Sequence, residues 1–198
     1  MEKDNIQNRL LNIGRKMVRE NGPDALTVRK LSEASGCSVG AIYNQFSNME
    51  NFIVIQNYKT LETLAEKLQK VERSGDPYID LNNMLNTFVD FVLNNKNLWY
   101  LLYRFHLHKD ARSYSSFYLR KVAKIVQMIK NLTAEIMPQM ERPERILSTQ
   151  VLWLTLFALS ALLTKDVLDS YAKIDKRTLC QIFLNTYIAG LTVLEQKS

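Results

Sequence analysis

The sequence predicts an all-α protein, and three observations support this prediction. Only 6 Gly and 4 Pro occur in 198 residues, and a sheet of many strands requires more of these turn-forming residues. Apolar residues recur at intervals of three and four along most of the chain, which is the period of amphipathic helices. Hydrophobic residues make up 46% and charged residues 23%, values that exclude a disordered or fibrous chain.

The first expected helix carries one apolar stripe, formed by Ile6, Leu10, Ile13 and Met17. Its end is predicted at Asn21-Gly22-Pro23, because Gly tolerates the left-handed backbone of a helix end and Pro cannot continue the helix.

Two short helices follow, joined by a tight turn. Thr27 has the side chain of a helix N-cap and begins the first of them, and Gly36 permits a sharp turn after it. Ser38 is the next N-cap, before a helix over about Val39 to Gln45. Two helices in this arrangement predict a helix-turn-helix unit.

The rest of the chain predicts longer helices. Ser47 with Glu50 fits a capping box that would begin a long helix reaching about Val71. Further helices are expected over about 78–94, 97–109, 113–137, 144–165 and 176–196. The total is about nine helices, divided into an N-terminal domain over residues 1–50 and a helical C-terminal domain over residues 51–198.

The segment from Thr27 to Phe46 resembles the DNA-binding segment of the TetR family of bacterial transcriptional regulators. The shared features are a Thr-capped helix, Ala-x-Gly at the turn, a Ser cap, then a small residue, an apolar residue, Tyr43 and Phe46. The resemblance implies a homodimer that binds a palindromic DNA operator, more often as a repressor than as an activator. It covers roughly residues 6–56, and the remaining chain is similar to the family only in length and helical content.

The resemblance also implies which residues meet DNA. Thr27 and Tyr43 would contact the DNA backbone, and Val39, Gly40 and Asn44 would face the bases. The full candidate set is Thr27, Arg29, Ser38, Val39, Gly40, Tyr43, Asn44 and Gln45. Their chemistry agrees with this, because Gly40 allows close approach to the major groove and Asn or Gln can pair with adenine. Ile42 and Phe46 are expected to pack in the core instead.

One position departs from the family. Met49 stands where the family usually has a Lys that meets a phosphate. The loss of one ionic contact predicts weaker DNA affinity and a salt dependence shallower by about one unit.

The net charge of +6 is not concentrated in the expected DNA-binding domain. Residues 1–50 hold seven basic and six acidic side chains, whereas residues 96–130 hold eight basic side chains and one acidic. The basic segment is interpreted as the solvated face of a helix; the alternative is attraction of an anionic ligand or of a second stretch of DNA.

Aromatic residues are frequent between residues 78 and 165. Aromatic side chains at helical spacing are usually core, but the resemblance implies a pocket for a small apolar or amphipathic effector. The candidate pocket residues are Phe88, Trp99, Tyr103, His106, Trp153 and Phe157.

The last two helices are interpreted as a surface for dimerisation, because Val151–Leu163 is apolar on nearly all sides and Ala189-Gly190 permits close helix approach. The candidate interface residues are Leu156, Leu163, Leu179, Phe183, Thr186 and Gly190. The apolar stretch from Ile146 to Leu163 is shorter than the roughly 20 residues of a membrane span. It is therefore expected to be a helix buried on most of its circumference, and no membrane association is expected.

No cofactor, metal site or enzymatic activity is expected. Cys37 and Cys180 are too few for a disulfide framework, which favours a cytoplasmic protein. His106 and His108 point to different sides of a helix and cannot share one metal ion. The sequence thus predicts a ligand-responsive DNA-binding regulator. The alternative is a helical bundle that binds a small molecule and whose head no longer binds DNA.

Overall fold

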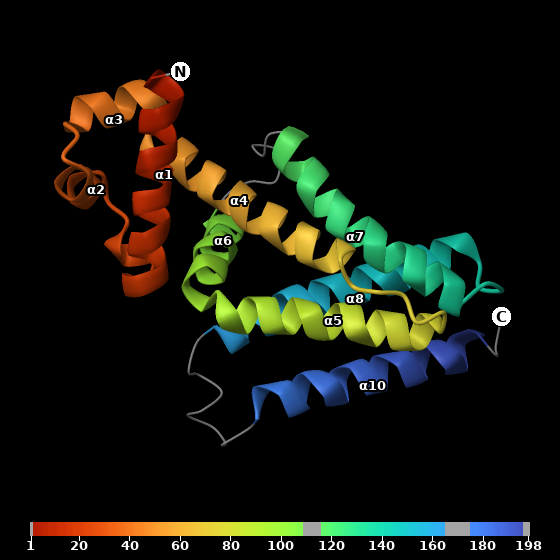
Figure 1. The fold of residues 1–198 in the computed structure, drawn as a ribbon. Coiled ribbons are helices and arrows are strands. Elements are labelled where there is room, and N and C mark those ends of the chain that lie inside the picture. Colours follow the sequence, from red (N-terminus) through yellow and green to blue (C-terminus); the bar gives the residue numbers. More distant parts are fainter. Residues whose placement is uncertain (1, 109–115, 165–174, 196–198) are drawn as a thin grey trace. The chain divides into compact units, whose positions relative to one another are not determined.

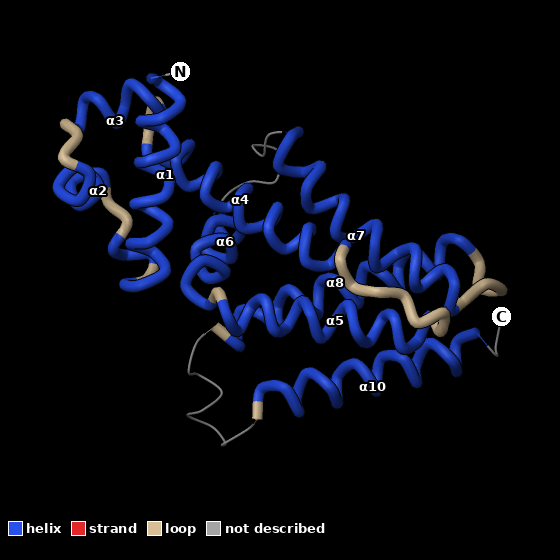
Figure 2. Tube along the Cα trace, viewed as in Figure 1, coloured by secondary structure: helices blue, strands red, loops and turns tan. Residues whose placement is uncertain are grey.

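The computed structural model describes residues 2–108, 116–164 and 175–195 (Figure 1). Nine α-helices and one short 3-10 helix account for most of this described part, and Figure 2 shows helices joined by loops without a strand in it. The elements are α1 (Glu2–Asn21), η1 (Pro23–Ala25), α2 (Val28–Ser35), α3 (Val39–Phe46), α4 (Met49–Gln69), α5 (Pro77–Asn94), α6 (Lys96–His108), α7 (Ser116–Ile136), α8 (Arg142–Leu163) and α10 (Lys176–Glu195). The predicted all-α class is confirmed. The expected start of a helix near 113 and the expected linker after 165 lie outside the described residues.

The chain forms two compact units. Unit 1 comprises residues 1–62 and 95–118, and unit 2 comprises residues 63–94 and 119–198. Unit 1 includes α6 because this helix packs against α1, where Asn97 donates to the carbonyl oxygen of Arg19 at 2.9 Å. The division at residue 50 remains a prediction about domains.

The core of unit 1 is built around α1 and the start of α4. Phe46 of α3 and Phe52 of α4 meet edge to face, with ring centroids 4.8 Å apart. The buried members of this core are Leu10, Leu11, Val18, Leu26, Leu31, Ile42, Phe46, Phe52, Leu98 and Leu101. Burial of Ile42 and Phe46 agrees with their expected packing role.

The apolar stripe expected on α1 is shifted in the structure. Ile6 is exposed, and Ile13 and Met17 are only half-buried, whereas Leu11 and Val18 are buried. The shift is explained by Gly14, which lies on the buried side of α1. A Cβ atom there would lie 2.6 Å from Cζ of Phe52, so α4 approaches α1 at a glycine, which the apolar period of α1 does not include.

Unit 2 packs α5 against α8 and α10. The buried side of α8 carries Thr149, Leu152, Leu156, Ser160, Ala161 and Leu163. The other side is apolar and exposed, with Leu147 at 60%, Val151 at 57% and Leu154 at 64%. The expectation that this helix is buried on most of its circumference is therefore wrong for the single chain.

α8 is the one helix in the described part of the chain whose length and composition would allow it to cross a membrane. Its buried side packs inside unit 2, where the Thr149 and Thr133 hydroxyl groups form a 2.9 Å hydrogen bond. A partly buried helix of a helical domain meets the same criteria of length and composition.

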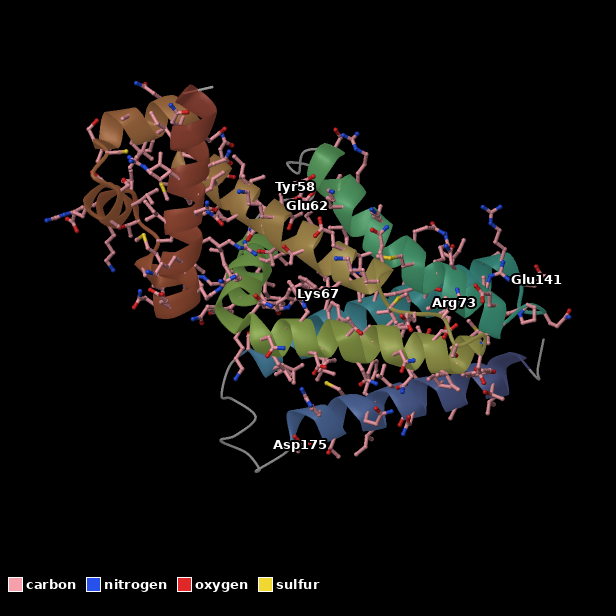
Figure 3. The ribbon with its side chains drawn as sticks, in the orientation of Figure 1. Tyr58, Glu62, Lys67, Arg73, Glu141 and Asp175 are labelled. Carbon is pink, nitrogen blue, oxygen red and sulfur yellow. The ribbon has the colours of Figure 1, made fainter. Side chains whose placement is uncertain are left out.

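A buried carboxylate holds the α4–α5 connection in place within unit 2. Asp80 is 1% exposed and accepts from the backbone N–H of Ser74 at 2.6 Å and from Nε of Arg73 at 2.6 Å. The same Arg73 guanidinium reaches Glu135 of α7; Figure 3 labels Arg73 in this connection. The hydrogen bond from the Ser74 N–H, followed by the hydroxyl of Ser74 and the charge of Arg73, lowers the pKa of Asp80.

We predict that Gly14→Ala lowers the free energy of unfolding by about 1 kcal/mol. Overpacking against the Phe52 ring costs roughly 1–3 kcal/mol, and the better helix propensity of Ala offsets up to about 1 kcal/mol of it. Gly40→Ala is the matched control, because the nearest described atom to a Cβ at this helical position is Oγ of Ser38, 4.0 Å away. Urea unfolding of both variants measures the difference, and equal stability of the two would contradict the packing argument.

We predict that Asp80→Asn destabilises the protein at neutral pH and has a smaller effect in acid. Because the pKa of Asp80 is lower in the folded chain than its ordinary value of 3.8, the carboxylate stabilises the fold above that value. The stabilisation is lost as the pH falls through the folded pKa. Urea midpoints from pH 7 to pH 3 test this, with Asp90→Asn in the exposed pair with Arg177 as the control. A difference from wild type that stays constant with pH would count against the prediction.

Candidate nucleic-acid interface

The first helix of the helix-turn-helix unit, α2, begins at the predicted cap. Thr27 has an extended backbone, and its hydroxyl oxygen accepts from the backbone N–H of Lys30 at 3.3 Å. The cap satisfies one of the amide groups that the first turn of a helix leaves free. Thr27 itself remains exposed, so its hydroxyl lies at the surface of unit 1.

The turn between α2 and α3 is fixed by local hydrogen bonds. Gly36 has a φ of 69°, the left-handed conformation that glycine adopts without strain. The hydroxyl of Ser32 donates to the carbonyl oxygen of Cys37 at 2.6 Å. Ser38 then caps α3 by accepting from the backbone N–H of Ala41 at 3.2 Å. Both predicted caps and the predicted turn are present.

α3 separates its residues into a buried and an exposed side. Ile42 is 0% exposed and Phe46 is 3% exposed, and both belong to the core of unit 1. On a helix, positions 39, 40, 43 and 44 share the opposite side. All four are exposed, including Val39 at 39% and Tyr43 at 40%. Gln45 lies at the edge and is half-buried.

The exposed side of α3 is uncharged. Arg29 of α2 is exposed but pairs with Glu33 at 3.2 Å, which neutralises part of its charge. Lys30 is the other exposed cation of α2. The surface can therefore donate and accept hydrogen bonds and make apolar contacts, with few positive charges at its centre.

The junction between α3 and α4 differs from the expectation. Ser47 has a φ of 65° and ends α3, and its N–H donates to the carbonyl oxygen of Tyr43 at 2.7 Å. Asn48 caps α4 instead, since its Oδ1 accepts from the N–H of Asn51 at 2.8 Å. The predicted cap at Ser47 is wrong by one residue, because Ser47 is needed to close the preceding helix.

Comparisons with known proteins agree with this geometry. Residues 10–54 match the family described as "Bacterial regulatory proteins, tetR family". The match spans the second half of α1, both helices of the helix-turn-helix unit and the beginning of α4.

The chain belongs to the TetR family.

Solved structures show the same fold over most of the chain. A tetR-family transcriptional regulator from Streptomyces coelicolor aligns with a TM-score of 0.71 at 16% identity, covering 97% of this chain and 82% of that one. The TetR-family regulator PfmR from Thermus thermophilus aligns with a TM-score of 0.65 at 14% identity, covering 91% of this chain and 97% of that one. BioQ, solved with its double-stranded DNA operator, aligns with a TM-score of 0.67 at 12% identity, covering 93% of this chain and 96% of that one. No curated protein sequence matches the chain.

Family membership establishes the coarse function of this TetR-family protein, which is a DNA-binding transcriptional regulator. The family is not enzymatic, in agreement with the prediction that the chain is no enzyme. Among the residues that the structure describes, no three His, Cys, Asp or Glu side chains are placed to hold a metal ion.

Met49, the position of departure from the family, lies at the first turn of α4. Its side chain is half-buried and packs against the core of unit 1. A thioether in this place contributes packing and cannot replace the charge of a lysine at a phosphate.

The six candidate effector residues of this TetR-family protein divide between the two units. In unit 2, Trp153 lies 6.3 Å from Phe88 and 6.2 Å from Phe157, measured between ring centroids. In unit 1, Trp99 is buried, while Tyr103 and His106 are half-buried. These assignments remain predictions.

His106 belongs to an aromatic group in unit 1. The hydroxyl of Tyr118 lies 3.3 Å from its Nε2, and Nδ1 lies 2.9 Å from the carbonyl oxygen of Leu102. Burial lowers the pKa of His106. The imidazole is therefore held in its neutral form over a wider pH range than a free histidine.

The candidate interface residues lie in different environments. Leu156 and Leu163 are each 1% exposed and pack inside unit 2, so neither is placed to contact a second chain. Thr186 and Gly190 are exposed on α10, and Leu179 and Phe183 are half-buried. The larger exposed apolar side chains of α8 and α10 are at other positions, namely Leu147, Val151, Leu154, Leu162, Ile182 and Val193.

Two features of the residue chemistry were not identified from the sequence. The Sγ of Cys37 accepts from the guanidinium of Arg9 at 3.2 Å, which ties the turn to α1. Gly14 sets the distance between α1 and α4. A single Arg or a single Gly in an amphipathic helix belongs to no sequence pattern, so neither the contact of Arg9 nor the close approach at Gly14 could be predicted.

Proposed function

We propose that the protein is a ligand-responsive regulator, most simply a repressor, that binds a palindromic operator as a homodimer. The observation that carries the proposal is the exposed side of α3, with Val39, Tyr43 and Asn44, held by a capped helix on a packed core. The proposed location is the cytoplasm, where a regulator meets the chromosome of a bacterium.

The proposed DNA contacts follow from the chemistry of each side chain. Asn44 can donate and accept at the edge of adenine, and Val39 can contact the methyl group of thymine. The hydroxyl groups of Thr27 and Tyr43 suit phosphate oxygens, with Arg29 and Ser38 beside them. Gly40 leaves room for the helix to approach the groove. Gln45, at the edge of this side, completes the set.

A second copy of the chain is the proposed occupant of the apolar surface on α8 and α10. Leu147, Val151 and Leu154 follow one another at intervals of four and three along the exposed side of α8. A groove of about 440 Å³ runs between this side and α10, with Thr186 and Gly190 in its wall. Exposed apolar area of this kind commonly marks a protein–protein interface, and a two-fold pairing of the surface would bury it.

The proposed effector contacts are two groups of aromatic side chains, one in each unit. The aromatic row of Phe88, Trp153 and Phe157 in unit 2 and the group of Trp99, Tyr103 and His106 in unit 1 are the proposed contacts. Rings with a few polar ends suit a small apolar or amphipathic molecule.

Two observations favour the alternative of a bundle whose head does not bind DNA. Met49 packs into the core of unit 1, and α3 carries neither Lys nor Arg, so the ionic part of DNA binding is small.

Arg120 and Lys124 of the basic segment are exposed on α7, and they remain candidates for a separate anionic contact.

We predict that Asn44→Ala weakens binding to a selected operator by about tenfold to a hundredfold, the loss typical of one base contact, and leaves non-specific binding almost unchanged. A random duplex pool enriched on the wild-type protein supplies the operator, and fluorescence anisotropy measures both affinities. Asn12→Ala is the matched control, because Asn12 is exposed on α1, outside the proposed surface. Failure to enrich any sequence would favour the bundle, and equal losses on both duplexes would contradict a base contact by Asn44.

We predict that Leu154→Glu converts a dimer into a monomer, because a buried unpaired carboxylate at an interface is costly. Light scattering coupled to size exclusion at micromolar concentration measures the mass. Ile79→Glu is the control, since Ile79 is an exposed apolar residue of α5 in the same unit. A monomeric wild-type protein, or a dimer that tolerates Leu154→Glu, would overturn the proposed interface.

A further inference from the structure

The guanidinium group of Arg9, on α1, lies against the turn that joins α2 and α3. Its Nη2 donates to Sγ of Cys37 at 3.2 Å and to the carbonyl oxygen of Ser35 at 3.4 Å. Ser38, which follows Cys37, caps α3. The guanidinium is therefore held beside the N-terminal end of the helix that is proposed to enter the DNA groove.

Most of this guanidinium group remains available to a further partner. Arg9 is exposed, and its Nε and Nη1 donate to no residue in the described part of the chain. No described acidic side chain forms an ion pair with it either. A guanidinium group carries several N–H donors and keeps its charge at any physiological pH, so Arg9 can bind an anion without first breaking an ion pair.

Neighbouring cations of α1 and α2 are engaged in other ways. Ion pairs join Arg29 to Glu33 and Lys16 to Glu20. Arg15 is half-buried and donates to α4. Arg9 differs from the first two cations because it has no acidic partner among the described residues, and from the third because it is exposed.

The position beside α3 gives Arg9 a specific opportunity. The second helix of a helix-turn-helix unit places its N-terminal residues against base edges in the major groove. Phosphate groups line the edges of that groove, so a cation at this end of α3 would lie near them. The planar fork of an arginine suits two oxygens of one phosphate, and the existing hydrogen bonds to the turn reduce the freedom that binding would remove.

We propose that Arg9 binds a phosphate of the operator and supplies an ionic contact where Met49 cannot. The inference rests on the proposed function and adds a contact outside the candidate set of α2 and α3. Because a phosphate contact carries no sequence information, Arg9 contributes to the affinity for every duplex. The contact also makes binding more dependent on salt, since each neutralised phosphate releases counterions.

The salt dependence of binding in Arg9→Gln tests this contact. We expect the slope of log K against log salt to be shallower by about one unit for each bound chain, with binding weaker by about fivefold to tenfold per chain at about 0.1 M salt. The loss is expected on the selected operator and on a random duplex alike, in contrast to Asn44→Ala. Fluorescence anisotropy measures both.

Arg19→Gln is the matched control, because Arg19 is an exposed cation nearer the other end of α1 and its replacement removes the same charge. Its slope is expected to stay within about 0.3 units of wild type. An unchanged slope in Arg9→Gln, or an equal change in both variants, would overturn the proposal.

A second variant distinguishes a phosphate contact from support of the turn alone. Arg9→Lys keeps the charge but loses the planar fork, so it is expected to keep most of the wild-type slope and to bind less tightly. Melting temperatures show whether each variant is folded. If Arg9→Lys has the shallower slope expected of Arg9→Gln, the charge at this position does not meet a phosphate and the proposal fails.

Neutral methylphosphonate linkages, placed one at a time in the selected operator, locate the phosphate. At the contacted linkage, neutralisation is expected to weaken the wild type by about fivefold or more and to change Arg9→Gln by less than about twofold. At other contacted linkages, both proteins are expected to lose equally. A scan in which no linkage separates the two proteins would contradict the contact.

The same titrations separate this inference from the proposed function. If the wild type selects an operator and Arg9→Gln keeps its slope, only the phosphate contact fails. If the wild type binds neither duplex, the proposed regulator fails, and the phosphate contact fails with it.

Discussion

The close approach of α4 to α1 at Gly14 is the contact on which the rest of unit 1 depends. The ring of Phe52 occupies the space that a side chain at position 14 would take. The same ring meets Phe46 at the end of α3, so this packing supports the C-terminal end of α3. The exposed side of α3 is consequently presented from a packed core, as a surface proposed to enter a DNA groove requires.

The segments that could be predicted from the sequence are those whose geometry is local. A cap such as Thr27 or Ser38 depends on an oxygen and an amide three residues apart, and Gly36 depends on its own backbone angle. The family resemblance was carried by these positions as well. Local hydrogen bonds are visible in a sequence because both partners lie within one turn.

The remaining features depend on partners far away in the chain. The buried side of α1 was misplaced because the partner at Gly14 is Phe52, whose position the periodicity of α1 does not contain. The apolar composition of α8 indicated burial, yet one side of this helix is exposed in the single chain. An apolar composition predicts that a helix surface is buried, but it does not identify the molecule that buries it.

The central claim is that the exposed side of α2 and α3 is the DNA-binding surface. Hydrogen exchange of the full chain with and without its selected operator duplex tests this claim most directly. We expect slower exchange at the backbone amides of residues 27–44 in the complex, with little change in α7. Protection concentrated in residues 116–136, or no protection of α2 and α3, would contradict it.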